Sequence, residues 1–141
     1  MKRTRVKRQS KKNPLVRECD NLVRAIVFDR DGYTCERCGS DKALDPMHFF
    51  CKNRYQNIRW LEINIVTGCR DCHCYFHGRP IEFKMWFSRR WRDRYEELLR
   101  LKDTMRKPDL KDLRLELLAR QPEIASVPVK RMGIDFDSLP F

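Results

Sequence analysis

Two pairs of cysteines, Cys35 with Cys38 and Cys69 with Cys72, constrain the fold of this chain more than any other feature. Each pair has the spacing C-x-x-C, which lets one tight turn present two thiolates to the same ion. Four thiolates complete the tetrahedral coordination that zinc adopts in structural sites. The sequence therefore predicts a structural Zn²⁺ site that joins the two pairs.

The residues around the two pairs predict how the site is built. Gly39 follows the first pair, as in a zinc knuckle, where glycine lets the backbone turn. The second pair follows Gly68 and coincides with an expected helix start. A knuckle combined with the first turn of a helix is the ligand arrangement of a treble-clef fold. Cys19 belongs to an apolar helical face, whereas Cys51 and Cys74 lie beside the site and are alternative ligands.

The charge of the chain indicates a polyanionic partner. Its 141 residues suffice for one compact domain with tails. Lys and Arg total 31 against 20 Asp and Glu, which gives a formal net charge of +11. We expect a nucleic acid as the partner, contacted by a basic N-terminal arm that is otherwise disordered and solvated. The basic residues of this arm are Lys2, Arg3, Arg5, Lys7, Arg8, Lys11 and Lys12.

The sequence gives no indication of a membrane partner. No apolar run approaches the roughly 20 residues that a membrane span requires, and the N-terminus lacks the apolar stretch of a signal peptide. An odd number of cysteines in C-x-x-C pairs favours metal binding in a reducing compartment over disulfides. We therefore expect a cytoplasmic protein.

Proline, glycine and apolar periodicity predict an α+β fold, in which a small zinc-stabilised treble-clef or ββα-metal core is flanked by helices. Strands are expected at Met47–Phe50 and Ile58–Leu61, and a long helix from Pro80 to about Met105. The predicted segments are a basic arm (1–13), an N-terminal helix (14–31), a zinc-bound core (32–79), a helical region (80–121), and a linker with an acidic-aromatic tip (122–141).

The helix after Pro80 interleaves aromatic and basic residues. Trp86, Phe87 and Trp91 occur at helical spacing and are expected in the core. Arginines cannot be buried without partners, so those of this helix should form a charged face that contacts DNA phosphates or is simply solvated. These arginines are Arg89, Arg90, Arg92 and Arg94.

Three histidines lie close to the cysteine pairs. His48 falls within a predicted strand, where a histidine often does no more than bond one backbone carbonyl. His73 and His77 follow the second pair on the expected helix. Residues at i and i+4 project from one face of a helix, so these two imidazoles can hold a single cation.

The histidines belong to a pattern that resembles a known family. A histidine in a strand, Asn64-Ile65 shortly before a C-x-x-C pair, and a histidine on the next helix resemble the HNH, or His-Me finger, nucleases. The likeness is closer to the NinG (Rap) recombination endonucleases of lambda-type phages and covers about residues 28–100. It is carried by Asp45-Pro46-Met47-His48-Phe49, Ile58-Arg59-Trp60, Asn64-Ile65, Cys69 to Cys72 and Gly78.

The resemblance implies a metal-dependent DNA endonuclease. His48 would be the general base, and Asn64 would orient it or hold a catalytic Mg²⁺ or Mn²⁺ ion together with His73 or His77. Asp45 is a further candidate ligand. The resemblance also implies branched or Holliday-junction DNA as substrate and a phage protein in the bacterial cytoplasm. The helices after Pro80 expose enough apolar surface to suggest a homodimer, which would suit a symmetric junction.

Two positions depart from the family pattern. Met47 stands where many HNH enzymes have a metal-binding Asp or His, and His73 stands where the NinG-like pattern usually has asparagine. Met47 is the main argument for the alternative function, a zinc-stabilised DNA-binding adaptor without cleavage activity that recruits or mimics a partner through its C-terminal tail.

The C-terminal residues carry a second resemblance. Acidic residues before a terminal Pro-Phe are similar to the tip of bacterial single-stranded DNA-binding protein, which implies host proteins as partners. The alternative is an accidental likeness in a frayed tail. The residues concerned are Asp135, Phe136, Asp137, Leu139, Pro140 and Phe141.

Overall fold

The computed structural model describes residues 13–122, which combine α-helices with one small antiparallel sheet. The predicted mixture of helices and a small sheet is confirmed. The basic arm from Lys2 to Lys12 and the tip from Asp135 to Phe141 lie outside the described residues. The elements are α1 (Pro14–Arg30), β1 (Leu44–His48), the 3-10 helix η1 (Glu62–Asn64), β2 (Ile65–Cys69), α2 (Arg70–His77), α3 (Pro80–Arg90), α4 (Arg92–Thr104) and α5 (Leu110–Ala119).

Helix α1 begins and ends where the sequence predicts. The side-chain oxygen of Asn13 accepts a hydrogen bond from the amide of Leu15 at 3.0 Å, which caps the first turn ahead of Pro14. Gly32 follows the helix with a φ of +67°, a backbone conformation that glycine adopts without strain. The apolar stripe of α1 is buried, as expected for an amphipathic helix.

Strands β1 and β2 pair in antiparallel register, with Leu44 opposite Cys69 and His48 opposite Ile65. The predicted strand at Met47–Phe50 overlaps only the end of β1, and the strand predicted at Ile58–Leu61 is wrong. Residues 58–61 form turns in which Ile58 is buried, so their apolar run serves packing and not strand pairing.

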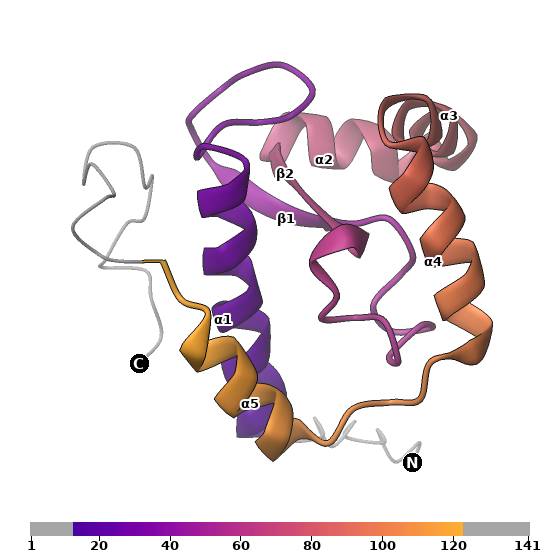
Figure 1. Cartoon of the computed structure of the whole chain (residues 1–141). Helices are drawn as coiled ribbons and strands as arrows, with labels where there is room; N and C mark the ends of the chain where they lie inside the picture. The colour runs from indigo at the N-terminus through magenta and orange to yellow at the C-terminus, as the bar shows by residue number, and fades with distance from the viewer. Residues whose placement is uncertain (1–12, 123–141) are drawn as a thin grey trace, which may run out of the picture.

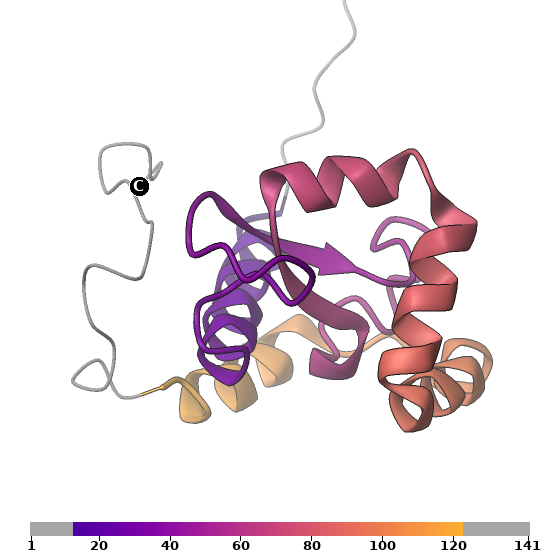
Figure 2. The same ribbon diagram turned by 90° about the horizontal axis from the view of Figure 1, so that it is seen from above.

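The sheet lies between two groups of helices (Figures 1 and 2). Helices α1 and α5 pack together on one side, and α2, α3 and α4 cover the other. Each group encloses an apolar cluster, centred on Val27 and Leu117 on the first side and on Met47 and Phe87 on the second. The β1–β2 sheet therefore lies between the two helical groups, and Cys69 stands at the end of β2.

The long helix predicted from Pro80 is interrupted. Trp91, at φ −134° and ψ 65°, separates α3 from α4. Its ring packs edge-on against Trp86, with ring centroids 5.2 Å apart, and lies 5.3 Å from Phe87. The bend at Trp91 thus directs α4 back along the aromatic cluster. Among the described residues, no helix is long and apolar enough to cross a membrane.

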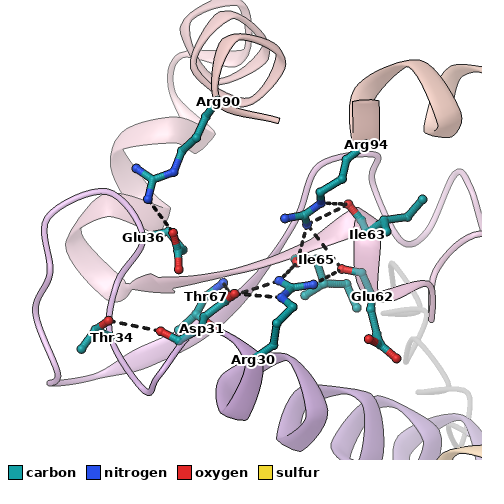
Figure 3. A network of polar contacts seen from close by, with 10 residues as sticks. All are labelled: Arg30, Asp31, Thr34, Glu36, Glu62, Ile63, Ile65, Thr67, Arg90 and Arg94. Atoms are coloured by element: carbon teal, nitrogen blue, oxygen red, sulfur yellow. Dashed lines mark hydrogen bonds and ion pairs between the residues drawn. The ribbon is translucent and has the colours of Figure 1, made fainter. Parts of the chain in front are cut away.

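Two arginines fasten the segment that leads into β2 (Figure 3). Arg30 donates to the carbonyls of Glu62 and Ile65, both at 2.7 Å. Arg94 donates to the carbonyl of Ile63 at 2.9 Å and to that of Ile65 at 3.2 Å. The prediction that Arg94 belongs to a solvated or DNA-binding face is therefore wrong, because its guanidinium donates to backbone carbonyls.

Candidate metal centres and an adjoining cavity

The four predicted zinc ligands converge. One sulfur from each of Cys35, Cys38, Cys69 and Cys72 lies within 4.8 Å of all the others. The sulfurs of Cys38 and Cys69 are 3.6 Å apart, close to the edge of about 3.8 Å that four Zn–S bonds of 2.3 Å produce in a tetrahedron. A disulfide would bring two sulfurs to about 2.05 Å, so this geometry suits a metal and not a cystine.

Backbone amides point at the sulfurs in the way that knuckle turns require. The amide of Cys38 donates to the sulfur of Cys35 at 3.5 Å, and the amide of Cys72 donates to the sulfur of Cys69 at 3.4 Å. Burial raises the pKa of the Cys35 thiol, but amide donors outweigh it and lower this pKa to about 7. The donor set therefore fits Zn²⁺, which binds thiolates.

The alternative ligands do not join this site. Cys51 and Cys74 are exposed, and among residues 13–122 the four cysteines above are the one group of three or more metal-binding side chains whose donor atoms lie this close together. Cys19 is buried in the apolar cluster of α1, as predicted. Arg37 donates to the sulfur of Cys72 at 3.4 Å, which offsets part of the negative charge that four thiolates would carry.

A second group of polar side chains lies on α2 and β1. Nε2 of His73 is 3.1 Å from Nε2 of His77, so the expected i, i+4 pairing on one helix face is observed. Nδ1 of His73 lies 3.3 Å from a carboxylate oxygen of Asp45, which also has the guanidinium of Arg70 at 3.6 Å. The three groups form a chain, Asp45 to His73 to His77, and not a converged set of ligand atoms.

His48 lies at the end of β1 with its ring largely enclosed. Its Nε2 is 3.1 Å from the carbonyl of Arg59, which can only accept, so Nε2 carries the hydrogen and Nδ1 has the free lone pair. Burial, with a contribution from Lys52, lowers the pKa of His48 to about 4. The ring is consequently neutral across the physiological range.

Asn64 is placed differently from the prediction. It is fully buried, and its Oδ1 accepts from the amide of Phe50 at 2.8 Å. Its Nδ2 donates to the carbonyls of Phe50 at 3.2 Å and Ile58 at 3.4 Å. The predicted role as a metal ligand does not fit this geometry, because the oxygen that would bind the ion is bonded to backbone. Asn64 instead fixes the chain directly after His48.

One cavity of about 650 Å³ adjoins both groups. His48, His73 and His77 all border it. Lys52 and Lys84 add positive charge beside it.

Searches of protein-family models, curated proteins and solved structures returned no match to the chain. The geometry of this cavity is therefore the basis for a functional proposal.

The arginines predicted to contact DNA have different surroundings. Arg90 pairs with Glu36 at 2.7 Å and lies over the ring of Trp91, with its guanidinium carbon 5.0 Å from the centroid. Arg92 pairs with Glu96 at 3.1 Å on the surface. Arg89 is exposed. These positions are compatible with a phosphate-binding surface, and binding stays a prediction.

Sequence reasoning missed several residues that shape the site. Asp20 accepts from the guanidinium of Arg59 at 2.6 Å and from the indole of Trp60 at 2.8 Å, and this holds the turn whose carbonyl bonds His48. No local pattern marked that pairing, since the partners are far apart in the chain. Lys52 and Lys84 follow apolar residues in the sequence and carried no spacing signal of their own.

Proposed function

We propose that this protein is a metal-dependent DNA endonuclease of the HNH type, built on a treble-clef zinc core. The observation that carries the proposal is the placement of His48 beside the same cavity as the paired imidazoles of His73 and His77. A neutral histidine and a pair of imidazoles that can hold a cation, bordering one cavity, supply the groups that metal-assisted hydrolysis of a phosphodiester uses. The net charge of +11 suits a DNA substrate.

His73 and His77 are the proposed ligands of the catalytic ion. Two nitrogens bound to one ion at about 2.1 Å and at right angles lie about 3.0 Å apart, close to the 3.1 Å between the two Nε2 atoms. Asp45 would accept the Nδ1 hydrogen of His73, which keeps the Nε2 lone pair directed at the ion. The catalytic ion of the proposal is Mg²⁺ or Mn²⁺. When bound, the ion would stabilise negative charge on the phosphate.

His48 is the proposed general base. With its Nε2 hydrogen donated to the carbonyl of Arg59, Nδ1 is the nitrogen that can take a proton from water. Burial keeps the ring neutral but also makes it a weak base. An anionic phosphate entering the cavity would raise the pKa of His48 and so strengthen the base when substrate is present.

The substrate and setting of the proposal follow the resemblance to the NinG-like enzymes. We propose branched DNA, such as a Holliday junction, cleaved by a homodimer in the cytoplasm of a phage-infected bacterium. The proposed role of the segment from Asp135 to Phe141 is to bind host proteins that recognise the tip of single-stranded DNA-binding protein. Deletion of residues 139–141 should weaken that binding, and unchanged binding would refute the role.

One observation favours the alternative function. Met47, at the position where many HNH enzymes have a metal ligand, is 1% exposed and packs against Gly68. It fills the apolar cluster beneath the cavity and cannot supply a ligand. A zinc-stabilised DNA-binding adaptor without cleavage activity would retain this packing, so cleavage has to be measured directly.

The deciding experiment compares wild-type protein with His48→Ala on Holliday-junction, flap and linear duplex DNA, each with Mn²⁺ or Mg²⁺. We expect His48→Ala to lower the cleavage rate by about 10²–10⁴-fold, the usual contribution of a general base. Zinc content and DNA affinity should be unchanged. Glu116→Ala, an exposed position on α5, serves as the control. Undiminished cleavage by His48→Ala would refute the catalytic assignment, and no cleavage by wild type would support the adaptor.

A further inference from the structure

The cavity beside the histidines is larger and more apolar than phosphodiester hydrolysis requires. Its volume of about 650 Å³ lies within the range of about 300–1,000 Å³ typical of small-molecule sites. An ion, a water molecule and a phosphate would occupy only its polar part, near His73 and His77. The remaining walls include Phe50, Phe83 and Tyr95, whose rings offer apolar surface to a ligand.

Positive charge borders the apolar walls. Lys52 and Lys84 both line the cavity and are exposed. Within residues 13–122 neither lysine is paired with a carboxylate, so both ammonium groups are available to a ligand. A ligand that fits this site is planar and apolar in one part and anionic in the adjoining part.

Within DNA, one chemical group has this character. The sugar-phosphate backbone is polar throughout, and the faces of the bases are the apolar planar surfaces. In a duplex those faces are stacked on each other and cannot enter a cavity. A base reaches an aromatic pocket only after it leaves the stack, as in enzymes that flip nucleotides.

We propose that this cavity holds one unstacked nucleobase next to the proposed cleavage site. The aromatic walls contact its face, and Lys52 or Lys84 contacts the adjoining phosphate. The inference rests on the proposed function and deepens it, because it names the substrate feature that the site selects. Unpaired bases at branch points, mismatches and single strands cost least to unstack, so such DNA should bind in preference to a continuous duplex.

The test measures affinity by fluorescence anisotropy for two duplexes that differ only in one central unpaired thymine. Binding is measured without added divalent ion, on protein that retains its zinc. We expect wild type to bind the duplex with the unpaired base about tenfold more tightly. The test variant is Leu99→Glu, which places a carboxylate at the cavity from α4 at a residue 38% exposed.

Leu115→Glu is the matched control, because Leu115 is an exposed leucine on α5 that does not border the cavity. Both variants add the same charge, so the general loss of DNA affinity cancels in the ratio between the two duplexes. We expect the ratio to fall to about one in Leu99→Glu and to stay near ten in Leu115→Glu. Permanganate oxidation of the unpaired thymine gives a measurement independent of any variant, and wild type should protect that base.

Each outcome is decisive. Equal affinity of wild type for the two duplexes, a ratio retained in Leu99→Glu, or an unprotected thymine would overturn the inference. Cleavage of fully paired duplex with Mn²⁺ alongside equal affinities would leave the endonuclease proposal intact. Preference for the unpaired base without any cleavage would support the inference and count against the endonuclease. No DNA binding by wild type would overturn both.

Discussion

At the scale of single residues, backbone groups orient the side chains of the proposed site. The ring of His48 is held by the carbonyl of Arg59, and the amide of Asn64 is held by backbone atoms of Phe50 and Ile58. Such partners fix the tautomer of a histidine and the direction of an amide, and they do not depend on the protonation of another side chain. The chemistry of His48 is thus set largely by the turn that encloses it.

The depressed pKa of His48 predicts a pH-dependent stability. The native ring takes up a proton only near pH 4, whereas an unfolded histidine does so near 6.5. The contribution of His48 to the free energy of unfolding is therefore complete above about pH 6.5 and is lost as the pH falls towards 4. At pH 5 the free energy of unfolding is lower by about 2 kcal/mol. His48→Gln cannot titrate, so urea unfolding at pH 7 and pH 5 should show a loss smaller by that amount. Equal losses in wild type and His48→Gln would contradict the assignment.

At the scale of elements, the pairing of β1 with β2 depends on a close contact between two residues. A Cβ atom on Gly68 would lie 2.6 Å from Cε and 2.9 Å from Cγ of Met47, well inside van der Waals contact. Met47 is buried, and its side chain borders the cavity. Glycine at this position therefore lets the strand before the second cysteine pair approach the strand that carries His48.

Gly68→Ala should lower the free energy of unfolding by about 1–3 kcal/mol, the usual cost of overpacking a core. Gly78→Ala is the control, because the nearest atom to its added Cβ is the carbonyl oxygen of Tyr75 at an ordinary 3.8 Å. Chemical denaturation measures both. If the cost arises from this contact, Met47→Ala should destabilise the Gly68→Ala background less than the wild type. Additive effects would place the cost elsewhere.

Helices and strands were predictable where neighbouring residues determine their ends. They were not predictable where contacts between residues far apart in the sequence determine them. Pro14 and Gly32 mark the ends of α1, and both ends are confirmed. Strand β2 was missed because Gly68 and the cysteine pair obscure its apolar pattern. The interruption at Trp91 carries no proline or glycine, and it arises from packing of that ring on the aromatic cluster. The cysteine cluster was predictable from spacing, whereas the bonds of Asn64 depend on a turn that the sequence did not reveal.

At the scale of the whole molecule, two arginines join the two groups of helices through the backbone around the start of β2. Arg94 on α4 and Arg30 on α1 both donate to the carbonyl of Ile65, the first residue of β2, from the two helical groups. Burial and the neighbouring charge of Arg30 lower the pKa of Arg94 to about 10, yet it stays protonated near neutral pH. The two sides of the molecule are thus joined through one segment of backbone.

Loss of a predicted zinc ligand should unfold the core. Cys35→Ser is expected to lower the unfolding free energy by several kcal/mol, a large part of the 5–15 kcal/mol that stabilises an ordinary domain. Elemental analysis should give one zinc per wild-type chain and less in the variant, and calorimetry should show the lost transition. Cys51→Ser and Cys74→Ser, at exposed positions outside the cluster, should retain both zinc and stability. Equal stability of Cys35→Ser would argue against a metal at this site.

The cysteine cluster also provides a second link, besides the backbone, between the two halves of the core. The sulfurs of Cys38 and Cys69 are 3.6 Å apart, so residues 39–68 form a loop whose two ends lie together. This loop includes His48 and the exposed residues 51–54. With a metal ion bound to the four sulfurs, a protease that cuts the backbone at 51–54 would leave two fragments joined through that ion. The cut protein should then migrate as one species in a native gel and come apart once a chelator is added, because the ion would take the place of a peptide bond.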